Sequence, residues 1–192
     1  MTLDDLTSTI DDFNMFEDFI KEFILSDNAL FRMIYFPQKN PLLPEDEENP
    51  YKIFEDIEGD NTHGAVLFGR KFNTILNTAT IVVLVDFECY QKANSQEFDK
   101  ITIIFRIILK GVDVQKLENG VDRAFIIGKL ISDNFDLANV NGLGQVKKKS
   151  MGYSAINEEN SSYLLTFSAN SFSSDIGNNK NFKKRIFGDT NG

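Results

Sequence analysis

The chain has 192 residues, a length suited to one domain, and it carries a formal net charge of −9 at pH 7. Its single cysteine permits neither an internal disulfide nor a cysteine zinc cage, and its single histidine excludes a two-histidine metal site. No apolar run approaches the roughly 18 residues of a membrane span, and the acidic start MTLDDLTSTIDDF does not resemble a signal peptide. We therefore expect a soluble protein made in the cytoplasm, without membrane contact.

The charge is unevenly distributed along the chain. Residues 1–60 contain 16 acidic and 4 basic residues, whereas residues 61–192 contain 13 acidic and 16 basic residues. This asymmetry favours charge-complementary contacts with other proteins over general nucleic-acid binding, which requires a concentrated positive field.

Two helices are predicted at the N-terminus. Apolar residues recur every three or four positions over residues 9–25, which is typical of an amphipathic helix. A second helix is expected over residues 28–35, with Ser26 or Asp27 as its N-cap.

The stretch FRMIYFPQKNPLL, residues 31–43, cannot continue this helix. Pro37 lacks a backbone donor, and Pro41 disfavours the helical conformation at the residue before it. The segment nevertheless contains the aromatic pair Tyr35 and Phe36, followed by two leucines. It is therefore either a packed corner or a surface that another protein covers.

The loop that follows is predicted to be irregular over residues 37–73. It mixes prolines, acidic residues and isolated apolar residues, and loops of this length within one domain often have a function. Most of the acidic side chains are expected to be solvated.

Two alternating runs in the middle of the chain predict an antiparallel hairpin. Residues 78–90 and 101–110 both alternate between two faces, and a polar connection joins them. In the second run, residues 103, 105, 107 and 109 form the apolar face.

A helix and a second hairpin complete the expected fold. The helix is predicted from residue 117 or 119 to residue 135, with an apolar stripe formed by Val121, Phe125, Ile126, Leu130 and Ile131. After the NGLG break at residues 141–144, two further strands flank the turn NEENS. The fold class is therefore α+β: an antiparallel sheet of about four strands in two hairpins, with helices packed on one face.

These patterns divide the chain into four parts. The expected parts are N-terminal helices (1–36), an acidic irregular arm or loop (37–73), a sheet–helix–sheet core (74–172) and a basic flexible tail (173–192).

Asp86 and Glu88 are the residues most suggestive of an enzyme. Two positions apart on a strand, they face the same way at about 7 Å, a spacing that could hold a divalent metal in a nucleic-acid enzyme. Cross-strand pairing with Arg106 and Lys110, or plain solvation, is the simpler interpretation. The sequence offers no further acid and lysine that can be placed beside them, so we expect no catalytic, cofactor or metal site.

Two basic clusters suggest contacts with phosphate or protein. The first consists of Lys147, Lys148 and Lys149, and the second is KNFKKR at residues 180–185, followed by two apolar residues. Solvated turns, phosphate contact and docking onto an acidic, apolar surface of a neighbouring subunit are all compatible with these sequences. His63, in a turn, and Cys89, on an apolar strand face, are expected to be structural.

The order of these elements resembles the tail-terminator-like family of neck and tail-completion proteins encoded by tailed bacteriophages. Four stretches account for the resemblance and together cover most of residues 13–170. They are LFRMIYFPQKNPL, QEFDKITIIFRIIL, LENGVDRAFIIGKLISDNF and NVNGLGQVKKKSMGYSAINEENSSYLLTFSA. The loop from Glu45 to Asn73 is longer than expected for such a protein, and the basic tail after Phe172 has no counterpart.

The resemblance implies a structural virion protein without catalytic activity or cofactor. It implies a ring, commonly of six copies, that joins the head connector or adaptor to the tail proteins, with DNA passing through the lumen without sequence-specific contact. A small adaptor protein and the metal-dependent enzyme remain alternatives. Candidate subunit contacts are Tyr35, Phe36, Leu42, Glu45, Asp46, Glu47, Glu48, Lys147, Lys148, Lys149, Phe182, Lys183, Lys184, Arg185 and Phe187.

Overall fold

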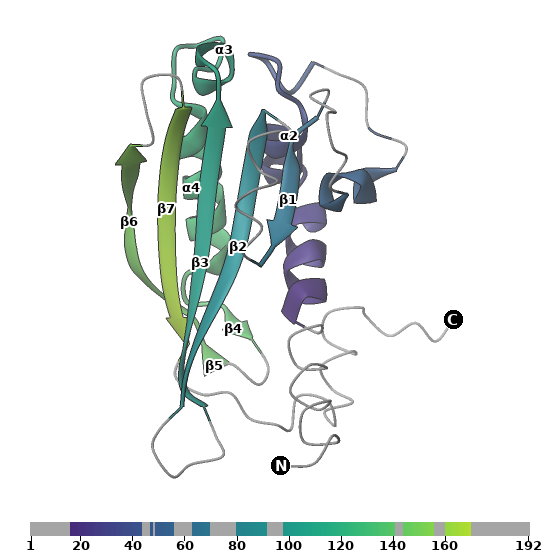
Figure 1. Ribbon diagram of the computed structural model, residues 1–192. Coiled ribbons are helices and arrows are strands. Elements are labelled where there is room, and N and C mark those ends of the chain that lie inside the picture. The colour runs from purple at the N-terminus through teal and green to yellow at the C-terminus, as the bar shows by residue number, and fades with distance from the viewer. Residues whose placement is uncertain are drawn as a thin grey trace, which may run out of the picture.

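A computed structural model describes residues 16–43, 47, 49–55, 63–69, 80–91, 98–140, 144–155 and 160–169. Residues 16–26 are helical, and the elements that follow are shown in Figure 1. They are α2 (Asn28–Tyr35), the 3-10 helix η1 (Pro50–Phe54), β1 (Ala65–Phe68), β2 (Ile81–Gln91), β3 (Phe98–Lys110), α3 (Val112–Gln115), α4 (Arg123–Phe135), β4 (Asn139–Val140), β5 (Gly144–Gln145), β6 (Lys147–Ala155) and β7 (Asn160–Ala169).

The fold is α+β and is built on a five-stranded mixed sheet. Its strand order is β1-β2-β3-β7-β6, and every neighbouring pair is antiparallel except β1 and β2, which are parallel. Both predicted hairpins are confirmed: β2 pairs with β3, and β6 pairs with β7. The strands β4 and β5 form a separate two-stranded sheet around the NGLG break, which the sequence analysis did not anticipate.

The predicted irregular loop over residues 37–73 is wrong in two places. Residues 50–54 form η1, where the side chain of Asn49 accepts a hydrogen bond from the backbone of Tyr51. Residues 65–68 form β1, the fifth strand. Because β1 is a short apolar run rather than an alternating one, it shows no strand period, although the glycines on either side of it mark its limits.

The helices pack on one face of the sheet, as Figure 1 shows for α2 and α4. The buried cluster on this face joins the helix over residues 16–26, α2 and α4 to alternate residues of β2, β3 and β7. At its centre the rings of Phe105, Phe135 and Phe167 lie 5.1–5.8 Å apart in edge-to-face geometry. The N-terminal helices and the sheet therefore share one core.

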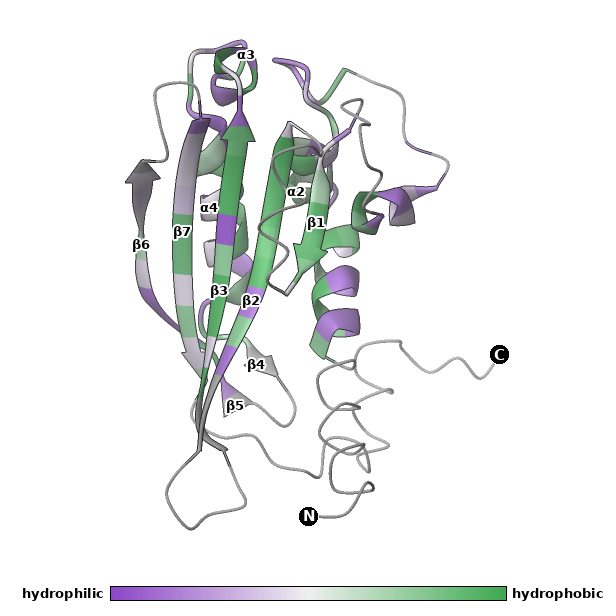
Figure 2. Cartoon of the chain, viewed as in Figure 1, coloured by the Kyte–Doolittle hydropathy of each residue, from purple (hydrophilic) through white to green (hydrophobic). Residues whose placement is uncertain are grey.

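A smaller buried cluster lies on the other face of the sheet. It is formed by Ala65, Leu67, Val82, Leu84 and Ile108. In Figure 2 the strands β1, β2 and β3 are correspondingly rich in hydrophobic residues, whereas β7 has a more mixed character. Hydrophobic residues on both faces of β2 explain why its first half reads as a continuous apolar run.

Helix α4 differs from its predicted limits and stripe. It begins at Arg123, where Asp122 is the N-cap, several residues later than expected. Of the predicted stripe only Ile131 is fully buried, whereas Val121 and Phe125 are exposed. The face against the sheet combines small residues with Ile127, Ile131 and Phe135, so the predicted stripe was placed partly on the wrong side of the helix. Its buried residues are Arg123, Ala124, Ile127, Gly128, Ile131, Ser132 and Phe135.

Candidate functional site

The chain that leaves α2 is held by one buried arginine, Arg123 of α4. Its Nη1 donates to the carbonyl oxygens of Met33 at 3.2 Å and Phe36 at 2.6 Å. Its Nη2 donates to those of Pro37, at 3.2 Å, and Gln38. The final carbonyls of a helix lack partners within the helix, so this guanidinium completes the end of α2 and fixes the turn after it.

The Arg123 side chain is fully buried, and burial lowers the pKa of its guanidinium to about 10. The group therefore stays charged at neutral pH. A second arginine supports the same corner, because the Nε of Arg32 donates to the carbonyl of Pro41 at 3.1 Å. The prolines at 37 and 41 supply carbonyl acceptors without competing donors, which suits a corner clamped by arginines.

The aromatic pair of this corner points into the subunit. Tyr35 is 5% exposed and stacks between Phe31 and His63, with ring centroids 5.2 and 5.0 Å away. Phe36 is partly buried against the same core. The corner is therefore packed at Tyr35 and Phe36, and these two predicted contact residues do not lie open on the subunit surface.

Leu42 and Leu43 form the exposed part of the corner, with 61% and 78% of their surface accessible. Beside them a groove of about 350 Å³ runs between the corner and residues 117–119. Its two sides are joined by hydrogen bonds from the backbone N–H of Glu118 to the carbonyl of Lys39, at 3.0 Å, and from Asn40 to the Glu118 carboxylate, at 2.8 Å. Of the predicted apolar contact residues that the structure describes, Leu42 is thus the most accessible.

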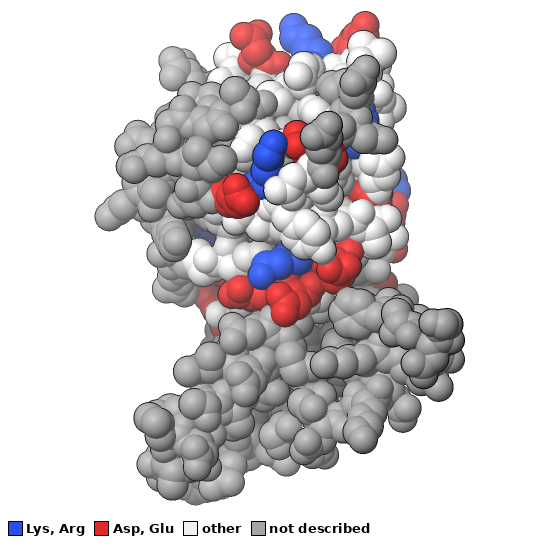
Figure 3. All heavy atoms as spheres, turned by 90° about the vertical axis from the view of Figure 1, so that its right-hand side faces the viewer, with Lys and Arg blue, Asp and Glu red and all other residues white. Residues whose placement is uncertain are grey.

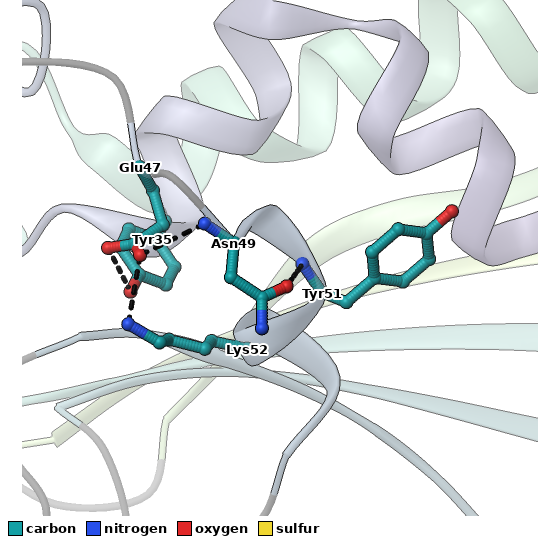
Figure 4. Close-up of polar contacts among 5 residues, drawn as sticks. All are labelled: Tyr35, Glu47, Asn49, Tyr51 and Lys52. Atoms are coloured by element: carbon teal, nitrogen blue, oxygen red, sulfur yellow. Dashed lines mark hydrogen bonds and ion pairs between the residues drawn. The ribbon is translucent and has the colours of Figure 1, made fainter.

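Glu47, predicted as a subunit contact, makes a set of contacts within its own chain (Figure 4). Its carboxylate accepts hydrogen bonds from the hydroxyl of Tyr35 at 2.9 Å and the backbone N–H of Asn49 at 3.2 Å. It also pairs with the ammonium of Lys52 at 2.9 Å. These donors, with Lys52 as the largest cause, lower the pKa of Glu47 from 4.5 to about 2.

Acidic and aromatic side chains gather beside Glu47, over η1, β1 and the helix formed by residues 16–26. We call this surface the acidic–aromatic face; Figure 3 shows this side of the molecule with its acidic residues. The Tyr51 hydroxyl donates to Glu22 at 3.3 Å, and the rings of Tyr51, Phe54 and Phe68 follow one another at 6.4 and 6.3 Å. The face therefore combines negative charge with accessible rings.

The basic cluster on β6 lies at the opposite edge of the sheet. Lys147, Lys148 and Lys149 are all exposed, and the register shifts between Lys148 and Ser150. The Nζ of Lys148 donates to the Ser132 hydroxyl at 2.8 Å. Lysines and a bulge on an edge strand also oppose uncontrolled strand pairing.

Asp86 and Glu88 lie on the sheet face away from the helices, opposite Ile104 and Thr102. Lys110 is six positions along β3 from the partner of Asp86, so the register removes it as an ion-pair partner of these acids. Arg106, two positions from Ile104, lies within diagonal reach of Asp86. Within the described ranges, no group of three or more His, Cys, Asp or Glu side chains is arranged to hold a metal.

Several predicted contact residues lie outside the described part of the chain. They are Glu45, Asp46, Glu48, Phe182, Lys183, Lys184, Arg185 and Phe187. Conversely, the sequence analysis missed the role of Arg123. An arginine directly after an N-cap aspartate, with no acidic residue in the first turn of its own helix, was the available signal.

Comparison with known protein families assigns the chain to one family. The sequence model of the YomW family matches residues 27–169, most of the chain and nearly all of the described fold. The chain belongs to the YomW family. YomW is a phage-derived family, named for a gene product of an SPBc2-like Bacillus phage, which indicates a phage protein but assigns no activity. No curated protein sequence matches this YomW-family chain.

In the described ranges, none of its helices is long and apolar enough to cross a membrane.

Proposed function

We propose that this YomW-family protein is a structural subunit of a tailed phage particle, forming a ring at the head–tail junction. The observation that supports this most directly is the placement of unlike charged surfaces at opposite edges of one sheet. The acidic–aromatic face lies beside β1, and Lys147, Lys148 and Lys149 lie on β6, four strands away.

Unlike surfaces on opposite sides of a subunit favour head-to-tail association. In such a contact one patch meets a different patch on the next copy, and a suitable rotation closes the set into a ring. Charges of this kind steer encounter and register more than they add affinity, whereas exposed apolar side chains such as Leu42 and Leu43 supply buried area.

In this proposal the neighbours are five further copies of the same chain, the number that the family resemblance implies, together with the connector or adaptor and the tail proteins. DNA passes through the lumen without sequence-specific contact. The protein acts in the virion, at the neck or tail, after assembly in the host cytoplasm.

Negative-stain imaging and mass measurement of the purified full chain, alone and with connector complexes, test this proposal. Closed rings of one chain support it, whether they form alone or only on the connector. A monomer or two-fold dimer that binds one partner without forming a ring would favour the adaptor alternative. Metal-dependent nucleic-acid cleavage lost in Asp86→Ala would favour the enzyme.

A further inference from the structure

The acidic–aromatic face has the chemistry of a docking site for a basic, aromatic peptide. Tyr51 is 53% exposed, and Phe54 and Phe68 are partly exposed beside it. The described acidic residues of this surface are Asp18, Glu22, Glu47 and Glu55, against Lys21 and Lys52.

Both lysines of the face are already engaged. Lys21 pairs with Asp18 at 3.2 Å and lies over the ring of Phe68, 5.6 Å from its centroid. Lys52 pairs with Glu47. Within the chain itself, this surface therefore holds ammonium groups against carboxylates and an aromatic ring, and it keeps an excess of negative charge from Glu22 and Glu55.

One segment of the chain complements this surface. Residues 180–187, KNFKKRIF, contain four basic residues, no acidic residue and three large apolar side chains. Residues 45–60, which include η1, contain eight acidic residues and one basic residue. The two segments therefore have opposite charge, and both combine that charge with aromatic residues.

The chain outside the fold is long enough for this contact. Strand β7 ends at Ala169, and the ten residues between it and residue 180 span up to about 36 Å when extended. The β1 edge is three strands from β7, a distance of about 14 Å across the sheet. The segment can thus reach past the edge of its own subunit.

We propose that residues 180–187 of one copy dock on the acidic–aromatic face of the next copy. Phe182, Ile186 and Phe187 contact the Tyr51, Phe54 and Phe68 rings, and the basic side chains lie against Glu22 and Glu55. This inference rests on the proposed head-to-tail assembly, for which it names the contact.

Photo-crosslinking of the full chain tests the docking. Phe182 is replaced by benzoylphenylalanine, and equal amounts of unlabelled and ¹⁵N-labelled protein are mixed, with and without connector complexes. We expect heavy–light crosslinks from position 182 to residues 16–26 and 50–55. Crosslinks only within one copy, crosslinks to other surfaces, or no crosslink would each overturn the proposal.

Charge reversal supplies the matched test. Lys183→Glu, Lys184→Glu and Arg185→Glu together should reduce the heavy–light crosslink by about tenfold, and Glu22→Lys with Glu55→Lys should restore it. The control, Lys129→Glu at an exposed position of α4 that belongs to neither charged surface, should leave the crosslink unchanged. Rings that form while position 182 crosslinks elsewhere would contradict the docking but leave the proposed function intact. Crosslinked pairs that never close into rings would support the docking and contradict the proposed ring.

Discussion

Arg123 illustrates how a single side chain can determine the path of a distant segment. Arg123 is the first residue of α4. Its guanidinium donates hydrogen bonds to four carbonyls at and after the end of α2, 85–90 positions earlier in the chain. Because those carbonyls are turned inward at a proline-bounded corner, no other donor in the described contacts replaces the guanidinium there.

Arg123→Ala should therefore destabilise the fold strongly. Loss of the buried donor leaves several carbonyls unsatisfied, and we expect the free energy of unfolding to fall by about 2–4 kcal/mol in chemical denaturation. Arg123→Lys should recover only part of this loss, because an ammonium cannot reproduce the planar fork. Lys129→Ala, at an exposed position of the same helix, is the control and should change stability by less than about 0.5 kcal/mol. Equal effects at both positions would contradict the clamp.

Glu47 gives a prediction for pH dependence. Its pKa is lowered from 4.5 to about 2 in the folded protein, so its carboxylate stabilises the fold above pH 4.5. That contribution should disappear as the pH falls from 4.5 towards 2, because protonation removes the acceptor of Lys52 and Asn49.

Melting temperatures of the unaltered protein and of Glu47→Gln across this pH range check the prediction. The unaltered protein should melt higher at pH 7, and the difference between the two should narrow as the pH falls. Glu55→Gln, at an exposed residue after η1, serves as the control. A difference in melting temperature that stays constant down to pH 2 would show that the Glu47 carboxylate does not supply the stabilisation that is lost at low pH.

At the scale of elements, the alternating strands were predictable and the close-packed ones were not. The period of β3 predicted its core face, residues 103, 105, 107 and 109, and Asp27 was correctly among the expected N-caps of α2. Strand β1 was not predicted because it is apolar on both faces. The preceding residue, Gly64, lies too close to the Ile34 carbonyl to carry a side chain. Such approaches arise only from tertiary packing, which a local period does not contain.

The same reasoning explains why the face of α4 was misjudged. Gly128 lies against β7, where an added Cβ would sit 2.7 and 2.9 Å from ring atoms of Tyr163. Ala124, Gly128 and Ser132 let the helix approach the sheet, and a stripe of large apolar residues that omits them included Phe125 on the exposed side. The contact set around Arg123 and the Glu47 cluster likewise depends on segments far apart in the sequence.

Gly128→Ala should consequently be destabilising although alanine favours helices. The propensity gain of about 1 kcal/mol is outweighed by the overlap with Tyr163, and we expect a net loss of about 1–2 kcal/mol in chemical denaturation. Gly152→Ala is the matched control, since nothing lies within 4 Å of the added Cβ there. A stability gain in Gly128→Ala would show that the helix is not held closely against β7.

At the scale of the whole molecule, the tail should be separable from the fold. Residues 174–192 lack an apolar period able to offset the entropy of ordering them. Among the residues that the structure describes, Ala169 is the last member of the core cluster. Deleting them should leave the melting temperature of the subunit within a few degrees but impair assembly. A large drop in melting temperature would mean that the segment belongs to the core.

The central claim is that this YomW-family chain builds a ring at the head–tail junction of a phage. The features that support this proposal are the acidic–aromatic face at one edge of the sheet and the basic strand at the other edge, both on one core. Electron microscopy of phage particles that carry a label at the C-terminus of this chain tests the claim most directly. We predict label arranged in a ring around the neck, with one copy per symmetry position. Particles without label, or label present as a symmetric two-fold pair, would contradict the account.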